Sequence, residues 1–469
     1  MTELDCDICV IGAGSGGLSV AAGASQMGAS VVLVEGARMG GDCLNYGCVP
    51  SKALLAAAKM ASAPGKASRF GVDLSAQVGF GRVNDHVKAV IGAIAPHDSA
   101  ARFSALGITV ILDRARFTGR DVVEAGGKRI RARRFVIATG SRPSVPPIPG
   151  LDTAPYFTNE TIFDNRTLPD HLVIIGGGPI GMEMAQAHHR LGARVTVLQA
   201  GAALARDDRE AANVLLQHLR AEGIAIREHV EIERVAAIAS GVSVTLKDGS
   251  VVVGSHLLVA TGRRANVDDM GLEAAGIAYS PKGVTVNARL RSTNRRVYAV
   301  GDAAGGPQFT HAANYHAGIV LRNILFRLPA KANHDAIPWV TYTDPELAGV
   351  GLSEVEARKR HGRINILRWP YAENDRAAAE HHTEGFVKAI VRPNGKILGA
   401  TIVGAQAGEL IQTWVLALSQ GLKIGALAGM VVPYPTLGEI SKRAAGAFYT
   451  PKLFSPATAR LVRFLARFG

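Results

Sequence analysis

Two cysteines stand five positions apart in a segment with the residue types of a redox centre. Cys43 and Cys48 lie within Gly40–Lys52, which reads Gly-Gly-Asp-Cys-Leu-Asn-Tyr-Gly-Cys-Val-Pro-Ser-Lys. At this spacing two thiols can meet across one irregular helical turn, so that one thiolate attacks a substrate while the other faces a cofactor. A zinc site requires further ligands, and no Cys or His pair with suitable local spacing accompanies them. The pattern favours a redox-active pair, with buried structural thiols as the alternative.

The other two cysteines, Cys6 and Cys9, imitate a Cys-x-x-Cys motif. They fall three apart in a predicted strand, where side chains alternate between faces, so we expect them on opposite sides of the sheet. The sequence predicts that both are small core residues without redox chemistry.

The elements that must position the Cys43–Cys48 pair begin directly before it. The segment Asp7–Ile11 is typical of a buried strand, Leu18–Met27 of a small-residue helix, and Val31–Val34 of a second strand that ends at Glu35. The turn Gly12–Gly17 joins the first strand to the helix. Strand, glycine turn, helix, strand and acid in this order predict a dinucleotide-binding unit.

Each residue of this fingerprint has a physical task. Gly12 permits the tight turn, Gly14 lets the backbone approach a pyrophosphate, and Gly17 allows close packing of helix against strand. The helix N-terminus offers free N–H groups to phosphate oxygens, and Glu35 is placed to bind ribose hydroxyls.

The same pattern recurs later in the chain. Leu172–Ile175 predicts a strand, Gly176–Gly181 a glycine turn, Met182–Leu191 a helix, and Val195–Leu198 the next strand. Two fingerprints so far apart indicate two nucleotide-binding domains.

The remaining segments complete the predicted organisation. Phe135–Ser141 and Leu257–Arg263 are apolar strands ending in small residues, and Val297–Asp302 is a strand with an acid at its carboxyl end. Prolines within 143–149 predict a stiff connection between domains. Beyond about residue 336 the pattern changes to antiparallel strands and helices, namely Val340–Thr343, Phe386–Val391, Ile397–Val403 and the helical Gly408–Gln420.

We therefore predict an α/β protein with two Rossmann-like dinucleotide-binding domains and a C-terminal α+β dimerisation domain. The first nucleotide domain is expected to be discontinuous, over residues 1–150 and 276–335. The second is expected over 151–275 and the dimerisation or interface domain over 336–469.

Composition narrows the class of protein. The 469 residues contain 53 Gly and carry a net charge of +13, which suits a compact α/β protein with anionic ligands such as phosphates. The charge is spread along the chain without a basic stripe, so nucleic acid is not an expected partner. No apolar run is long enough to span a bilayer, no secretory signal opens the sequence, and cytoplasm is the expected compartment.

On the motifs above the chain resembles the class I pyridine nucleotide–disulfide oxidoreductases. This family includes dihydrolipoamide dehydrogenase, glutathione reductase and mercuric reductase. The similarity covers essentially the whole chain, including Tyr342–Glu346 and Tyr434–Glu439.

The resemblance implies a homodimer that binds FAD in the first nucleotide domain and NAD(P)H in the second. It implies that Cys48 lies under the flavin as the charge-transfer thiol and that Cys43 is the interchange thiol that meets the substrate. Lys52 resembles the lysine near flavin N5 and is expected to pair with Glu183 on the nicotinamide side. The expected FAD-binding residues are Gly12, Gly14, Gly17, Glu35, Gly41, Lys52, Ala115, Thr139, Gly140, Ser141, Asp302, Thr310 and His311. The expected NAD(P)-binding residues are Gly176, Gly178, Ile180, Gly181, Glu183, Gln199 and Gly262.

One departure from the family concerns the substrate. Disulfide-reducing members carry a His-Pro near the C-terminus, and that histidine of the partner subunit shuttles a proton for the interchange thiol. Here Tyr434 occupies the position, followed by Glu439. A phenol with a pKa near ~10 is a poorer shuttle at neutral pH than an imidazole near ~6.5. Tyrosine at this position resembles mercuric reductases, yet no cysteine follows Cys48, whereas those enzymes carry a C-terminal pair.

The expected function is therefore an FAD-dependent NAD(P)H oxidoreductase of the mercuric-reductase-like branch. It would pass electrons through Cys43–Cys48 to a small disulfide or a thiophilic metal ion, with no resident metal. One alternative is dihydrolipoamide dehydrogenase, and another is a redox-sensing flavoprotein that acts on a partner protein. Gln199 and Ala200 leave the coenzyme open with a preference for NADH, because no arginine stands immediately beside them. The segment Ala459–Phe468 resembles a basic amphipathic helix, for which contact with a membrane surface is weighed against a docked or frayed terminus.

Overall fold

The computed structural model describes residues 2–468, and the chain divides into two compact units. Unit 1 contains residues up to 64 together with 75–200 and 229–334, and unit 2 contains 65–74, 201–228 and the residues from 335 onward. Both nucleotide fingerprints and both cysteine pairs lie in unit 1. The division of the chain into three domains with the expected boundaries stays a prediction.

The first sheet of unit 1 is built on the first fingerprint. β1 (Thr2–Ile11) lies between β2 (Val31–Val34) and β6 (Lys128–Ile137), and β3 (Thr109–Ile111) and β18 (Val297–Ala299) extend the parallel part. An antiparallel hairpin of β4 (Arg116–Gly119) and β5 (Val122–Ala125) continues from β6. Buried β-branched and Leu residues on both faces are typical of a parallel sheet covered on both sides.

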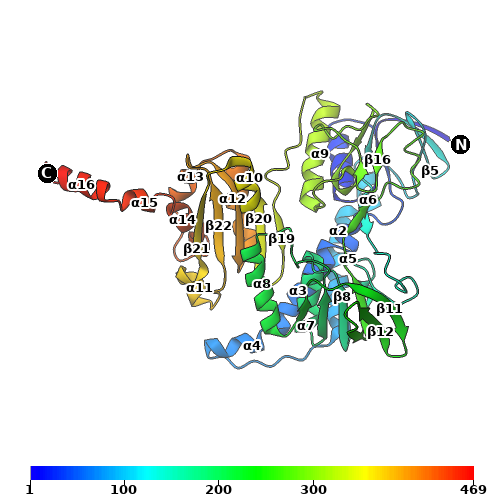
Figure 1. The fold of residues 1–469 in the computed structure, drawn as a ribbon. Helices are drawn as coiled ribbons and strands as arrows, with labels where there is room; N and C mark the ends of the chain where they lie inside the picture. The colour runs from blue at the N-terminus through cyan, green and yellow to red at the C-terminus, as the bar shows by residue number, and fades with distance from the viewer. Residues whose placement is uncertain (1, 469) are drawn as a thin grey trace. The chain divides into compact units, whose positions relative to one another are not determined.

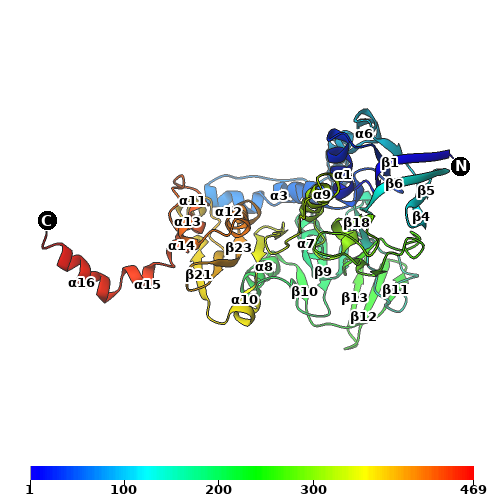
Figure 2. The same cartoon turned by 90° about the horizontal axis from the view of Figure 1, so that it is seen from above.

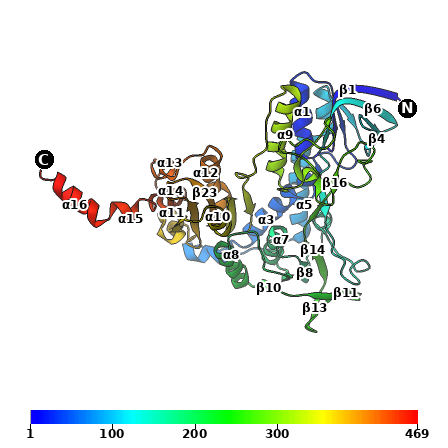
Figure 3. The same cartoon turned by 45° about the horizontal axis from the view of Figure 1, so that its top comes forward.

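Two helices cover one face of this sheet. α1 (Ser15–Gln26) and α9 (Thr310–Leu325) pack side by side, as Figure 3 shows. α1 can lie this close to β1 because its first turn consists of small residues. A Cβ atom on Gly17 would lie 1.9 Å from the Gly12 carbonyl oxygen, so only glycine fits there.

The second fingerprint forms its own parallel sheet. β8 (His171–Ile175) lies between β9 (Arg194–Leu198) and β14 (His256–Val259), and α7 (Pro179–Arg190) follows β8. The helix α3 (Cys48–Ala61) packs against α7, as Figure 3 shows, which brings the cysteine segment next to the second fingerprint. A short antiparallel pair, β7 (Ser141–Pro143) with β15 (Arg263–Ala265), links the chain segments entering and leaving this region.

The other elements of unit 1 are helices and two small antiparallel sheets. They are the helices α2 (Gly41–Asn45), α5 (Phe80–Ile94) and α6 (Ala100–Ala105), the sheet of β11 (Ile232–Ile238), β12 (Gly241–Leu246) and β13 (Val251–Gly254), and the sheet of β16 (Tyr279–Ser280) and β17 (Gly283–Val284).

Unit 2 is an antiparallel sheet with helices packed on it. The strand order is β19 (Trp339–Thr341), β20 (Glu346–Gly351), β23 (Ile397–Gly404), β22 (Phe386–Val391), β21 (Asn365–Pro370). α12 (Ala407–Ser419) lies on β20 and β23, as Figure 2 shows, and its fully buried Trp414 anchors the core. The other helices are α4 (Pro64–Ala67), α10 (Glu354–His361), α11 (Asp375–Ala379), α13 (Ile424–Ala428), α14 (Glu439–Gly446), α15 (Thr450–Leu453) and α16 (Pro456–Leu465).

The segment 201–228 belongs to unit 2 although it follows the second fingerprint. It carries α8 (Arg209–Glu222) and the short β10 (Ala225–Arg227). The buried Lys388 ammonium lies 2.9 Å from the Asp208 carboxylate and 2.8 Å from that of Glu354. An unpaired buried ammonium would be costly, so these ion pairs specify where α8 packs.

The predicted fold class is confirmed by these sheets, and each predicted strand and helix is present with shifts of a few residues at its ends. Within residues 2–468, none of the helices combines the length and the hydropathy that crossing a bilayer requires.

Candidate active site

The Cys43–Cys48 pair lies at the junction of two helices. Cys43 is in α2, and Cys48 is the first residue of α3, with Tyr46 and Gly47 forming the break between them. A Cβ on Gly47 would come within 2.9 Å of the Asp42 carboxylate, so glycine keeps the turn compact. Both cysteines are free thiols, and their side chains share a hydrogen bond. The break between α2 and α3 fits the irregular helical turn that the sequence predicts, and the redox role of the two sulfurs stays a prediction.

The hydrogen bond makes the two thiols unequal acids. Donation from Cys43 lowers the pKa of Cys48 to about 6, assisted by the Thr310 hydroxyl and the Lys52 charge and opposed by burial. The same hydrogen bond, with burial, raises the pKa of Cys43 far above its ordinary value. At neutral pH the reduced pair therefore shares one proton, with the thiol on Cys43 and the thiolate on Cys48.

The N-terminus of α9 faces the Cys48 sulfur. Thr310 is the first residue of this helix, and its hydroxyl oxygen lies 3.5 Å from the Cys48 sulfur. The first turn of α9 contains no acidic residue. The positive end of the helix dipole stabilises an anion at this position. The next residue, His311, stacks on Phe309 with ring centroids 5.2 Å apart.

A second charged pair lies one turn along α3 from Cys48. The Lys52 ammonium donates to a Glu183 carboxylate oxygen at 2.8 Å, as the sequence predicts. The Glu183 side chain is only 6% exposed, whereas that of Lys52 is 35% exposed. A nearly buried carboxylate fixes the amine at the end of its flexible stem, so the pair holds a positive charge near Cys48.

A polar network that the sequence did not predict ties the cysteine segment to both nucleotide fingerprints. The Arg263 guanidinium lies 3.0 Å from the Asp42 carboxylate and donates to the Ser141 hydroxyl at 2.7 Å. Ser141 in turn donates to Asp302 at 2.5 Å, and burial raises the pKa of that carboxyl group. Arg263 directly follows Gly262 at the end of the predicted strand Leu257–Arg263. Its place next to an expected nucleotide-binding glycine was the signal in the sequence that could have identified it. The network positions Asp42, the residue before Cys43, and Asp302, which is among the expected FAD-binding residues.

The first glycine turn has the shape that a pyrophosphate requires. Gly14 caps α1 without a side chain, and the first turn of α1 contains no acidic residue. A Cβ on Gly41 would come 2.6 Å from the Gly14 Cα atom, so two bare backbone segments face each other here. The carboxylate of Glu35 accepts hydrogen bonds from the amides of Ala13 at 2.5 Å and Ala37 at 2.7 Å, which stiffens the turn. These residues fit the FAD that the resemblance implies.

The second glycine turn repeats this arrangement. Gly178 caps α7, and a Cβ there would meet open space, so its backbone is accessible to a ligand. The Gln199 amide oxygen accepts from the Gly177 amide at 2.7 Å, as Glu35 does in the first turn. With its oxygen engaged, Gln199 has its NH₂ end left for a ligand. Ile180 is 38% exposed beside the turn. These residues fit a second dinucleotide.

The remaining predicted site residues fall into two groups. In unit 1, the Thr139 hydroxyl donates to the Asn266 carbonyl at 2.6 Å, Gly140 adopts a left-handed conformation, and Ala115 precedes β4. In unit 2, the Tyr434 hydroxyl donates to the Asp375 carboxylate at 2.7 Å, which raises the pKa of the phenol. Glu439 begins α14 in the same unit. The functional roles expected for these residues stay predictions.

The Cys6–Cys9 pair differs from expectation in its geometry. The amides of Asp7 and Ile8 both donate to the Ser30 carbonyl at 3.1 Å, at the point where the pairing of β1 with β2 begins. The prediction of opposite faces is wrong, because both thiols contact the same core cluster.

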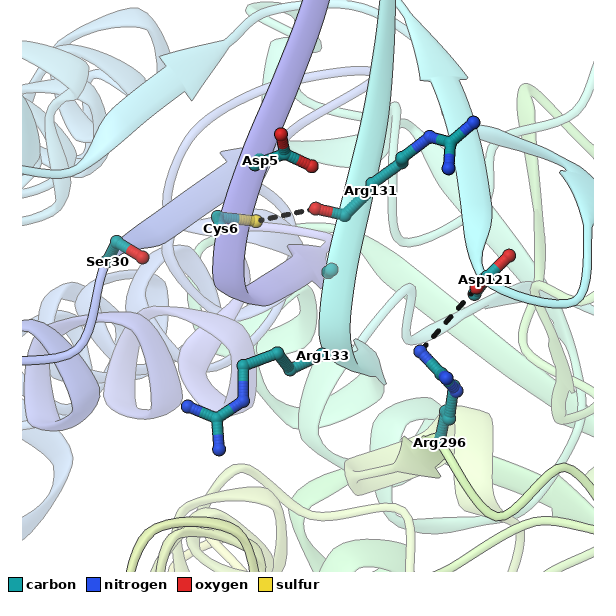
Figure 4. A pocket seen from close by; sticks show the side chains of 8 residues that line it. Asp5, Cys6, Ser30, Asp121, Arg131, Arg133 and Arg296 are labelled. Carbon is teal, nitrogen blue, oxygen red and sulfur yellow. Dashed lines mark hydrogen bonds and ion pairs between the residues drawn. The ribbon is translucent and has the colours of Figure 1, made fainter.

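An open cavity shown in Figure 4 includes Cys6, whose sulfur donates to the Arg131 carbonyl at 3.8 Å. Burial raises the pKa of Cys6 to about 12 and that of Cys9 well above its ordinary value. Both thiols therefore stay protonated at neutral pH, in contrast to Cys48, which agrees with the prediction that they carry no redox chemistry.

The fold and the site together define a class of protein. It is an α/β protein whose first unit contains two glycine turns suited to dinucleotides and, between them in the sequence, a thiol–thiolate pair. The model of the pyridine nucleotide-disulphide oxidoreductases matches residues 6–317, and the dimerisation-domain model of the same family matches residues 337–445. The chain belongs to this family of flavoprotein oxidoreductases, whose members use FAD and NAD(P)H.

Individual relatives cover almost the entire chain. A mercuric reductase of Streptomyces lividans is 35% identical over 94% of this chain and 96% of its own length. A dihydrolipoyl dehydrogenase of Thermus scotoductus is 34% identical over 94% of this chain and 97% of its own length. Among solved structures, the Cu(II) complex of the HOCl-induced flavoprotein disulfide reductase RclA from Escherichia coli aligns with a TM-score of 0.84 at 28% identity. That alignment covers 93% of this chain and 98% of the other.

Proposed function

We propose that the chain is an FAD-dependent NAD(P)H oxidoreductase that acts, as a homodimer, on a thiophilic metal ion through Cys43 and Cys48. The observation that carries the proposal is the pair of free thiols at Cys43 and Cys48, with the Cys48 sulfur 3.5 Å from the Thr310 hydroxyl at the N-terminus of α9. The dimerisation-domain match supports the homodimer. We also propose that the FAD-binding domain comprises residues 1–150 and 276–335, the NAD(P)-binding domain 151–275 and the dimerisation domain 336–469.

When bound, NAD(P)H and FAD supply the hydride and the electron pair that open the Cys43–Cys48 disulfide. The two glycine turns hold the two pyrophosphates through backbone N–H groups. Lys52, kept in place by Glu183, and the N-terminus of α9 provide positive charge where electrons collect. The Arg263 network holds Asp42 and Asp302 in fixed positions on either side of the cysteine segment.

The reduced pair is suited to a soft metal ion. A divalent ion that binds both sulfurs displaces the single shared proton from Cys43 and gains two thiolate ligands, which soft metals prefer. A two-electron acceptor such as mercuric ion then takes both electrons from the two thiolates and leaves as the metal while the Cys43–Cys48 disulfide re-forms, whereas cupric ions would each take one electron. The site needs no acid to protonate a leaving group. The mercuric reductases among the relatives and the copper complex of RclA support this substrate class.

A disulfide substrate makes a further demand on the site. The Cys43 sulfur must attack the disulfide while its proton passes to the departing thiolate. The Cys48 thiolate must then displace the second thiolate and re-form the Cys43–Cys48 disulfide. Both steps benefit from a group that accepts and returns a proton near neutral pH. Tyr434 replaces the histidine of disulfide-reducing relatives, and its hydroxyl proton is committed to Asp375. Efficient turnover of lipoamide is therefore not expected.

The coenzyme is proposed to be NADH. The NH₂ group of Gln199 can donate to a ribose hydroxyl and does not repel a 2′-phosphate, while no arginine follows it directly in the sequence. NADPH is therefore expected to bind more weakly without being rejected.

Steady-state assays with purified, FAD-loaded protein test these proposals. NADH oxidation is measured with mercuric ion, cupric ion, lipoamide and glutathione disulfide, and then repeated with NADPH. The expected result is turnover with a metal ion that is lost in Cys43→Ser and in Cys48→Ser. Lipoamide turnover equal to the metal-dependent rate would instead establish dihydrolipoamide dehydrogenase activity.

The similarity to the dihydrolipoyl dehydrogenase of Thermus scotoductus supports the alternative of dihydrolipoamide dehydrogenase activity. If neither metal nor disulfide is turned over while Cys43–Cys48 still cycles with NADH, the chain acts as a redox sensor toward a partner protein.

A further inference from the structure

The chain ends in a helical segment, residues 450–468, that lies beyond the matched dimerisation domain. The family match stops at residue 445, and α15 and α16 follow it at the red end of the ribbon in Figure 1. α16 has its own start signal, because the Ser455 hydroxyl accepts from the Thr458 amide at 3.2 Å and Pro456 occupies the first turn. Across the described residues 450–468 no side chain is buried. The helix is thus specified by its own sequence and carries no packing task within the chain.

One face of α16 and its C-terminal continuation is apolar. Leu461, Phe464, Leu465 and Phe468 follow the spacing i, i+3, i+4 and i+7, which places them along one side of a helix. Their exposed fractions are between 53% and 74%, and the rings of Phe464 and Phe468 stack edge to face at 5.2 Å. Large apolar side chains gathered on an exposed face mark a surface that meets a partner.

The neighbouring side of the same helix is basic. Arg460, Arg463 and Arg467 repeat at i, i+3 and i+7, and Lys452 precedes them in α15. Residues 450–468 contain no Asp or Glu. An apolar stripe flanked by an arginine row, on a helix too short to cross a bilayer, is the design of a helix that lies in a lipid–water interface.

Charge decides between a lipid surface and a second copy of this chain as the partner. Another copy carries a net charge of +13, and protein interfaces exclude unpaired charge from their cores. An anionic lipid surface attracts all four basic residues while its acyl region accepts the phenylalanine and leucine side chains. We propose that residues 450–468 dock the protein on anionic membranes through the apolar face of α16. This interaction is independent of the substrate proposed above.

Vesicle flotation of the full-length, FAD-loaded protein tests the proposal. Wild-type protein should float with vesicles of phosphatidylcholine and phosphatidylglycerol but not with phosphatidylcholine alone, and high salt should weaken binding. The triple substitution Arg460→Gln, Arg463→Gln, Arg467→Gln should weaken binding at least ~10-fold, because each basic residue near the surface contributes roughly fivefold. Phe464→Ser with Leu465→Ser should weaken it similarly by removing the apolar anchor.

A charge-matched control removes three exposed basic residues elsewhere in unit 2: Lys359→Gln, Arg360→Gln, Arg363→Gln. It should bind like wild type. Equal losses in this control and the helix variant would overturn the proposal, because net charge alone would then explain the binding. Dissociation of the oligomer by the Phe464→Ser, Leu465→Ser variant, measured by light scattering, would also overturn it in favour of a second copy as the occupant.

Discussion

Replacing Cys43 by alanine removes the hydrogen bond that contributes most to the acidity of Cys48. That bond is the first of the causes that bring the pKa of Cys48 from 9.0 to about 6, while burial acts in the opposite direction. At pH 7 a thiol with a pKa near 6 is about nine-tenths ionised, and one with a pKa near 9 is about one-hundredth ionised. The Thr310 hydroxyl and the Lys52 charge remain in the variant, so we expect a midpoint between these limits, at least ~1 pH unit above that of wild type.

The thiolate absorbance of Cys48 measures this midpoint. Each protein is titrated after reduction, with Cys48→Ala as the reference for wild type and the double alanine variant as the reference for Cys43→Ala. Wild-type Cys48 should lose its charge as the pH falls through about 6. A midpoint near 6 in Cys43→Ala would refute the reasoning and assign the acidity to the α9 N-terminus and Lys52 instead.

Three further outcomes are expected. Tyr434→His should raise lipoamide turnover at least ~10-fold and leave metal-dependent turnover unchanged, because an imidazole accepts protons near neutral pH; an unchanged lipoamide rate would contradict this role for the position. Gly17→Ala should lower bound flavin per chain at least ~10-fold, since the new Cβ would lie 1.9 Å from the Gly12 oxygen; normal flavin absorbance would contradict it. Glu183→Gln should lower the free energy of unfolding by about 1–2 kcal/mol, less than the ~3–5 kcal/mol for a fully buried pair because Lys52 is 35% exposed. As a control, Asp164→Asn breaks the exposed pair with Lys88 and should change the free energy of unfolding by less than ~0.5 kcal/mol in chemical denaturation. Equal effects of the two substitutions would contradict the assignment of Lys52–Glu183 as the more strongly stabilising pair.

Local patterns account for what the sequence predicted well. Both glycine turns, the first strand and helix of each fingerprint, and the Cys43–Cys48 turn depend on residues close together in the chain. Backbone conformation and hydrophobic periodicity are therefore enough to identify them. The Lys52–Glu183 pair was also expected, from the resemblance to the family, although its partners are distant in the chain.

The features that sequence reasoning missed depend on long-range contacts or local irregularity. Arg263 reaches Asp42 only after the β7–β15 pair and the second sheet have formed. The two hydrogen bonds from Asp7 and Ile8 to the Ser30 carbonyl have no signature in an apolar strand pattern, and Cys6 was assigned to the wrong face. The hydrogen bond from Tyr434 to Asp375 likewise joins a loop to the first residue of α11, far away in the chain.

Because the two sulfurs share one proton, the way in which the midpoint potential of the dithiol depends on pH can be predicted. Closing the disulfide releases two electrons but only one proton while Cys48 is ionised and Cys43 is not. The potential should then fall by about 30 mV for each pH unit, half the slope of an ordinary dithiol. Below about pH 6, where Cys48 takes up its own proton, the slope should double. Above about pH 6 the reducing strength of the pair would thus change with pH only half as steeply as that of an ordinary dithiol.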